Sequence, residues 1–305
     1  MFLASPISFP NLGITVNPSR VAFTVFGKDI YWYGIIIAVG FILAAVYACR
    51  RAPQFGLTEE HVLDLLFIAV PFAIVFARLY YCVFYWDLYR DNPVSILYIW
   101  EGGLAIYGGV IGAVLGLMIY TKFKKIPPGP LMDLGGLGLL IGQLIGRWGN
   151  FVNREAHGSI TDGFFKMGLV NAAGETVYYH PTFLYESVWN LAGFVLLHFY
   201  SRKRRRYDGE IFTMYIAWYG LGRSWIEGLR TDSLYLFGTG LRVSQLLAVL
   251  SCLAAVSLLV WKLYVRPADP ERMLARRMEK KVEAAVEAAG TNWKESSSED
   301  TETEK

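Results

Sequence analysis

The chain has 305 residues, of which 54% are hydrophobic and only 18% charged, and its formal net charge is +3. An ordinary soluble domain is roughly 45–50% apolar and about 25% charged. The apolar residues lie in runs long enough to cross a bilayer core of about 30 Å as helices. The composition therefore excludes a soluble globular enzyme, a disordered chain and a disulfide scaffold, and it predicts an all-α integral membrane protein.

Seven candidate membrane spans follow an N-terminal segment, residues 1–29. This segment has no positive n-region, so we do not expect it to be a secretory signal peptide. Together the spans predict a membrane domain over residues 30–263. A charged tail over residues 264–305 is expected to begin as a helix and to end disordered. The spans are expected at approximately Ile30 to Cys49, Leu63 to Phe84, Gly103 to Tyr120, Leu131 to Trp148, Phe183 to Tyr200, Ile211 to Leu229, and Val243 to Leu263.

Basic residues concentrate in the loops that follow the odd-numbered spans, for example in the run from Arg202 to Arg206. Because cytoplasmic loops carry an excess of Lys and Arg, we expect the N-terminus outside and the C-terminus in the cytoplasm. The loop between the fourth and fifth spans, residues 153–181, would then lie outside. It is long enough for a small cap, in which Thr176 to Tyr179 is expected as a short strand.

Charged side chains inside the predicted spans are the first candidates for function, because such charges are costly in a bilayer. The alternative is a buried ion pair or a side chain that reaches to the interface. Arg78, Arg147 and Arg223 fall in the outer halves of their spans, where they can converge on one anion. Guanidinium groups suit a phosphate in a low-dielectric site. The full set is Arg78, Asp133, Arg147, Glu186, Arg223 and Glu227.

The region from Gly146 to Gly158 is the densest in polar and small residues. Arg147 and Asn150 are three residues apart and would share one side of a helix. They offer guanidinium and amide donors to a headgroup, and Glu155 offers an acceptor or base. A turn stabilised by its own polar groups is the alternative. The scattered His and Cys residues lack metal-ligand spacing, so we expect no metal and no cofactor.

This region resembles a motif of the bacterial prolipoprotein diacylglyceryl transferase family, G-R-x-G-N-F-x-N-x-E-x-x-G, and matches it at every fixed position. The resemblance extends from about Ile30 to Leu263. Its supporting motifs, in chain order, are Trp32-Tyr33-Gly34, Arg78 with Tyr81 and Tyr85, Gly102-Gly103-Leu104 before Gly108-Gly109, His180-Pro181 before Tyr185-Glu186, and Gly222-Arg223 before Glu227 and Arg230.

The resemblance implies transfer of the sn-1,2-diacylglyceryl group of phosphatidylglycerol to the lipobox cysteine thiol of a preprolipoprotein, with release of glycerol phosphate. The implied partners are phosphatidylglycerol, the lipobox peptide and the lipid bilayer, and no nucleic acid is expected. The implied location is the bacterial cytoplasmic (inner) membrane, with the active site toward its outer face.

Two sets of site residues are expected. The catalytic set is Arg147, Arg223, Glu227, Tyr107 and Glu155. The substrate-binding set is Arg147, Asn150, Gly158, Tyr33, Arg78 and Tyr81.

Tyr107 is the one departure from the family pattern, because many members carry at this position a His that has been cast as the base. A tyrosine is a poor base at neutral pH, so we expect Tyr107 to bind or position the headgroup, although nearby arginines could make it a better one. The alternative proton acceptors are Glu155, His157, Glu227 and the phosphate itself.

Two other classes share this composition. A lipid transporter or scramblase would need a polar path to both faces, often with internal repeats, whereas the arginines here favour the outer half. A seven-span retinal protein would need a mid-membrane Lys, and the last span has only Lys262 at its end.

Overall fold

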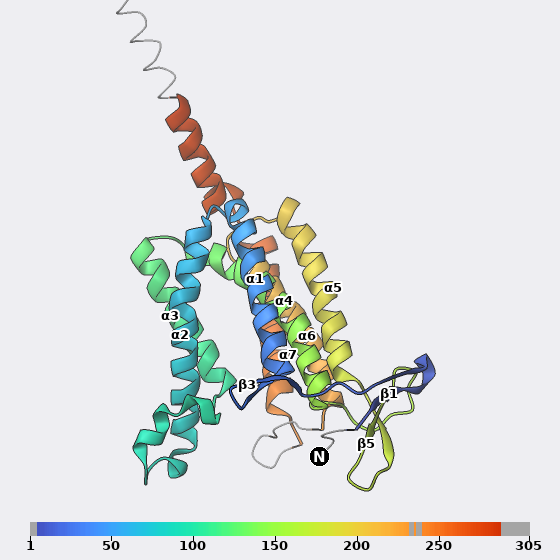
Figure 1. Cartoon of the computed structure of the whole chain (residues 1–305). Helices are drawn as coiled ribbons and strands as arrows, with labels where there is room; N and C mark the ends of the chain where they lie inside the picture. The colour runs from blue at the N-terminus through green and yellow to red at the C-terminus, as the bar shows by residue number, and fades with distance from the viewer. Residues whose placement is uncertain (1–4, 232–234, 236–239, 288–305) are drawn as a thin grey trace, which may run out of the picture. The chain divides into compact units, whose positions relative to one another are not determined.

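The computed structural model describes residues 5–231, 235 and 240–287, and these form two compact units. Unit 1 contains Met1–Ala48 and Met132–Asp269, and unit 2 contains Cys49–Leu131 and Pro270–Lys305. Figure 1 shows the elements in chain order.

Long helices make up most of the described chain, and each coincides with a predicted span to within a few residues. Those of unit 1 pack as a bundle, and α7 continues as one π-helical turn over Trp261–Val265. The mostly helical membrane fold is thus confirmed. The helices are α1 (Trp32–Arg51), α2 (Glu59–Phe84), α3 (Ile106–Lys124), α4 (Pro128–Asn153), α5 (Thr182–Lys203), α6 (Glu210–Leu229) and α7 (Val243–Val260).

Five helical stretches are long and apolar enough to cross a membrane: Trp32–Phe55, Glu59–Phe84, Ile106–Lys124, Pro128–Asn153 and Val243–Val265. α5 and α6 are also long enough, but polar and charged residues lower their apolar character. The seven-span topology therefore stays a proposal for these two helices.

The predicted strand Thr176–Tyr179 is present as β6 and pairs antiparallel with β5 (Met167–Val170). Two strands of the N-terminal segment, β1 (Ile7–Phe9) and β2 (Ile14–Val16), complete a sheet of order β2-β1-β5-β6. Ser8 of β1 lies opposite Gly168 of β5 (Figure 1). Residues 153–181 thus contribute two strands of this four-stranded sheet, and the all-α class omits these strands. A separate hairpin, β3 (Val21–Val25) and β4 (Lys28–Tyr31), leads into α1.

The sheet is fixed to the helices at the end of α4 and the start of α5. Its buried core consists of side chains from β1, β5 and α5, with Phe151 of α4 packed against it. Arg154, directly after α4, is buried and donates to Ser5 O at 2.8 Å and to Asn17 Oδ1 at 2.9 Å. These contacts hold the loop over residues 154–181 against the bundle.

Asp133 of α4, one of the charges inside the predicted spans, stabilises the start of α6. Its side chain is fully buried and accepts hydrogen bonds from Gly209 N and Phe212 N, each at 2.9 Å. Gly209 is the N-cap residue of α6 and has no side chain to cap the helix. Asp133 therefore supplies from a neighbouring helix the acceptor that a helix N-terminus requires.

In unit 2, α2 and α3 pack closely because glycines of α3 face the main chain of α2. A Cβ at Gly108 would overlap the carbonyl oxygen of Phe76, and one at Gly112 would overlap that of Phe72. Small residues at helix interfaces permit such approach in membranes. The charged tail begins as expected, with a helix over residues 274–287, and its predicted disordered end lies outside the described residues.

Candidate active site

Glu186, one turn into α5, lies at the centre of a cluster of partly buried arginines in unit 1. It is 4% exposed. Its carboxylate forms an ion pair with Arg147 of α4, and its Oε1 lies 3.3 Å from Nη1 of Arg223 in α6. Arg230, directly after α6, brings its Nη1 to 3.7 Å from the same oxygen. One carboxylate thus holds together three guanidinium groups from three parts of the chain.

Glu227 adds a second carboxylate to this cluster. Glu227 lies four residues after Arg223 on α6, and the two side chains are paired, with Nη2 of Arg223 2.6 Å from Oε2 of Glu227. Glu227 is buried, and Arg242, before α7, donates to its main-chain carbonyl. Buried charges of this kind are stable only when they are paired.

A chain of hydrogen bonds continues from Arg147 toward the loop. Arg147 Nη1 donates to Asn150 Oδ1 at 3.3 Å, and Asn150 Nδ2 donates to Glu155 Oε1 at 3.0 Å. Asn153 Nδ2 donates to the same oxygen at 3.3 Å. The polar side chains of the motif are therefore joined to the arginine cluster, and the structure brings together Arg147, Asn150, Glu155, Arg223 and Glu227.

Gly158, the last residue of the motif, is a point of close approach between main chains. Its N–H donates to His180 O at 2.9 Å, and it bridges with Arg230. A Cβ at this position would lie 2.7 Å from Cβ of His180 and 3.0 Å from Leu229 O. A side chain here would displace the segment that carries Arg230. Partial burial lowers the pKa of His180, which lies outside the membrane-spanning helices.

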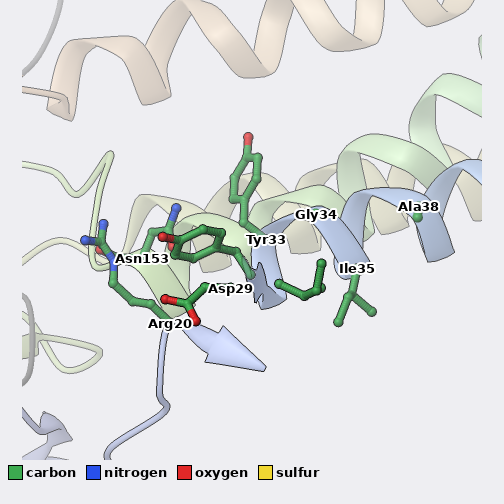
Figure 2. Close-up of a pocket in the computed structure, with 9 residues that line it drawn as sticks. Arg20, Asp29, Tyr33, Gly34, Ile35, Ala38 and Asn153 are labelled. Atoms are coloured by element: carbon green, nitrogen blue, oxygen red, sulfur yellow. The ribbon is translucent and has the colours of Figure 1, made fainter. Parts of the chain in front are cut away.

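Tyr33 lines an open cleft of about 700 Å³ in unit 1. Figure 2 shows Arg20, Asp29 and Asn153 gathered at one end of it, while the apolar residues of α1 extend from the other. The Tyr33 ring also lies on the motif, because a Cβ at Gly149 would lie 2.7 Å from its Cδ2. The cleft therefore borders α4 and combines a polar end with an apolar wall.

Arg78, Tyr81 and Tyr107 belong to unit 2, so their presence in the same site stays a prediction. The Arg78 guanidinium donates to main-chain carbonyls of the segment between α2 and α3, including Ile96 O at 2.8 Å and Gly102 O at 2.6 Å. Its centre lies 5.1 Å from the ring centroid of Tyr89. Arg78 thus orders the segment that leads into α3.

The other two residues lie along this segment. A Cβ at Gly103 would lie 2.9 Å from Cε1 of Tyr81. The Tyr107 ring, at the start of α3, lies 6.5 Å from that of Tyr80. Tyr107 is exposed within the described part of the chain, and Tyr81 is half-buried.

Two charged residues of the cluster, Glu186 and Arg230, were absent from the predicted site sets. Both occur in the motifs that carry the family resemblance, and Glu186 was noted as a charge inside a span. Their motif positions were the available signal. Spacing along the chain could not join them to Arg147, which is 39 residues before Glu186 in the sequence.

Comparison with known proteins places this geometry in context. The family model described as prolipoprotein diacylglyceryl transferase matches residues 20–261. The chain is 43% identical over 259 residues to a Listeria welshimeri protein, covering 82% of this chain and 92% of the relative. It is 42% identical over 273 residues to an Enterococcus faecalis protein, covering 86% and 96%. It is 46% identical over 237 residues to a Bacillus cereus protein, covering 75% and 87%. All three are named phosphatidylglycerol–prolipoprotein diacylglyceryl transferase.

Proposed function

The chain belongs to the prolipoprotein diacylglyceryl transferase family, and we propose that it carries out the reaction that the names of its relatives describe. It is a membrane transferase of lipoprotein biosynthesis, which moves the sn-1,2-diacylglyceryl group of phosphatidylglycerol to a prolipoprotein. The acceptor is the thiol of the lipobox cysteine. The family match favours this enzyme over a lipid transporter or scramblase.

The reaction is a displacement at the glyceryl carbon bonded to phosphate. The cysteine sulfur forms a C–S bond to this carbon, and the C–O bond to phosphate breaks with its electron pair moving to the phosphate oxygen. The thiol proton must leave, because the thiolate is the nucleophile. The products are a thioether-linked diacylglyceryl peptide and glycerol phosphate.

The observation that carries the proposal is the cluster of partly buried arginines around the buried carboxylate of Glu186. The phosphate gains negative charge as the C–O bond breaks, so preorganised cations stabilise the transition state more than the ground state. Arg147 and Arg223 are the residues to which we assign this role. They come from different helices and pair with the same carboxylate, so one phosphate can contact both.

Glu155 is our choice for the proton acceptor. Its Oε1 accepts from the neutral amides of Asn150 and Asn153, whereas Glu186 and Glu227 are paired with arginines. Glu155 is exposed and lies in the loop directly after α4, where a peptide can reach it. Glu227 then holds Arg223 in place, and Tyr107 positions the headgroup.

Substrate binding extends beyond the phosphate. The cleft beside Tyr33 suits an amphiphile, because its polar end adjoins Asn153 and its wall follows the apolar side chains of α1. Asn150 presents an amide next to Arg147, and Gly158 keeps the loop close to α5. We assign Arg78 and Tyr81 to the lipid-binding set on the strength of the family motif.

The proposed topology has seven spans, including α5 and α6, with the N-terminus outside and the C-terminus in the cytoplasm. The basic residues after α1, α3 and α5 support this orientation. Arg147 and Glu186 lie near the ends of their helices joined by residues 154–181, so the site is toward the outer face. The membrane is the cytoplasmic (inner) membrane of a bacterium.

A reconstituted transfer assay tests the proposal. Purified protein in detergent with phosphatidylglycerol is mixed with a lipobox peptide, and peptide mass and released glycerol phosphate are followed. We expect one diacylglyceryl adduct per glycerol phosphate, and no adduct with a peptide whose cysteine is replaced by serine. Folded protein that forms no adduct, while a known active relative does, would contradict the proposal and favour lipid transport.

A further inference from the structure

We propose that Glu186 sets the net charge of the arginine cluster, so that the cluster holds the singly charged phosphodiester of the substrate and releases the doubly charged phosphomonoester product. This inference rests on the proposed function. It makes Glu186 a positioning residue, which acts through Arg147, Arg223 and Arg230 rather than on the reacting atoms.

The cluster contains charges of both signs. Three guanidinium groups and two carboxylates, those of Glu186 and Glu227, contact one another. Among these five described side chains three are positive and two are negative, so each carboxylate lowers the positive charge of the cluster by one. Because all five side chains are mostly buried, water screens this charge poorly, and a single added or removed charge changes anion binding strongly.

The substrate and the product of the proposed reaction differ by one negative charge. The phosphodiester of phosphatidylglycerol has one negative charge, which the guanidinium groups attract. The leaving glycerol phosphate is a monoester, whose second ionisation lies near a pKa of about 6, so it carries nearly two negative charges at pH 7. The product therefore adds one unpaired negative charge beside the two carboxylates, and this repulsion favours its release.

Geometry assigns this role to Glu186 rather than to Glu227. Glu186 contacts all three arginines, and its oxygens occupy the N–H groups of Arg147 and Arg223 that a phosphate would use. Without substrate, Glu186 keeps the guanidinium groups gathered and paired. When the substrate phosphate takes over these N–H groups, the negative charge of Glu186 remains beside the phosphate. Glu227, by contrast, pairs with the other terminal nitrogen of Arg223, Nη2.

The sharpest test uses the unaltered protein and two competitors that differ by one charge. Binding of glycerophosphoglycerol, a singly charged diester, and of glycerol phosphate is measured by calorimetric titration at pH 7.5. We expect the diester to bind several-fold more tightly. Equal binding, or tighter binding of the monoester, would overturn the inference. Because titration needs no turnover, this result is separate from the transfer assay that tests the proposed function.

Glu186→Gln provides the second test, because it removes the charge and keeps the shape of the side chain. We expect glycerol phosphate to bind at least about tenfold more tightly than to the unaltered protein. Turnover should slow after a first burst equal to the enzyme concentration, because product release becomes limiting, while KM for phosphatidylglycerol does not rise. A purely structural role would lower kcat without tightening product binding, and that outcome would overturn the inference.

Two further variants complete the design. Asp64→Asn removes a carboxylate that pairs with Lys124 at 3.0 Å in unit 2, and it should leave product binding unchanged. Glu186→Asp keeps the charge and shortens the side chain, so it should lower kcat without tightening product binding. Tighter product binding in either variant would show that charge at Glu186 is not the cause. Thermal midpoints in detergent establish that each variant is folded.

Discussion

Trp189 of α5 and Trp218 of α6 stack with ring centroids 4.5 Å apart, and each indole N–H donates to the main-chain carbonyl of the other at 3.0 Å. Each ring also covers a glycine of the opposite helix, Gly222 beneath Trp189 and Gly193 beneath Trp218. This reciprocal pair fixes the position of α5 along the axis of α6. Glu186 is one turn before Trp189 on α5, so the pair also sets which residue of α6 reaches its carboxylate.

Gly222→Ala should disrupt this arrangement. A Cβ at Gly222 would overlap Nε1 of Trp189, so the indole or the helix must shift, and Arg223, the next residue, must shift with it. We expect transfer activity to fall by about tenfold or more and the thermal midpoint to drop. Gly228→Ala is the matched control on the same helix, because the nearest side-chain atom to a Cβ there would be Gln245 Nε2 at 3.6 Å. Equal activities of the two variants would refute the role of the tryptophan pair.

Arg147→Ala should abolish most turnover while the protein still inserts and folds. Loss of a group that stabilises developing charge costs about 10²–10³-fold in kcat. Arg147→Lys keeps the charge but not the two-pronged geometry that serves both Glu186 and Asn150, so we expect only partial recovery. The transfer assay, with membrane insertion checked by fractionation, measures both variants. Turnover near that of the unaltered protein in Arg147→Ala would remove Arg147 from the site.

The helices could be predicted from the sequence because the bilayer imposes a length and an apolar composition on each span. The ends shifted by a few residues where polar groups continue a helix past the apolar run. α4, for example, extends to Asn153 rather than ending near Trp148. Hydrogen bonding of the main chain, rather than hydropathy, decides such ends.

The small sheet was predicted only in part. Strands of three or four residues are too short to show a periodic pattern, and Ser8 pairs with Gly168, which lies 160 residues later in the chain. β6 was recognised from its consecutive β-branched and aromatic residues after Gly174. β1 lacked such a signal, because its pairing depends on a partner far along the chain.

The site was likewise predictable where its residues are close in the sequence and not where they meet only through packing. Arg147 and Asn150 are three residues apart, so helical spacing placed them on one face of α4, and Glu155 was grouped with them because it occurs in the same motif. The central role of Glu186 could not, because it depends on the packing of three elements. Asp133 is the opposite case. As a charge inside a predicted span it was a candidate for function, but in the structure it caps the N-terminus of α6.

Asp133→Asn should therefore lower stability without changing KM for phosphatidylglycerol. An asparagine has one acceptor oxygen, so one of the two N–H groups of Gly209 and Phe212 would lose its acceptor or face an amide donor. Leaving a buried donor unsatisfied costs about 1–3 kcal/mol. Unfolding in detergent measures the change, with Asp91→Asn, an exposed residue of unit 2 paired with Arg90, as the control. A stable Asp133→Asn variant with raised KM would instead place Asp133 in substrate binding.

His180 should make the loop beside Gly158 sensitive to acid. Burial lowers the pKa of His180 below its ordinary value of about 6.5, so the unfolded chain binds the proton more readily than the folded one. The stabilisation by neutral His180 is therefore present above about pH 6.5 and is lost as the pH falls below that value.

We expect both the thermal midpoint and the transfer activity to decline between pH 6.5 and 5, because His180 O accepts from Gly158 N and its Nδ1 lies 3.3 Å from the Tyr185 hydroxyl. His180→Asn keeps a polar atom near the Nδ1 position but does not titrate, so its decline over this range should be shallower. His61→Asn, in the first turn of α2 in unit 2, is the matched control and should keep the decline of the unaltered protein. An acid decline of the same size in His180→Asn would assign it to other groups.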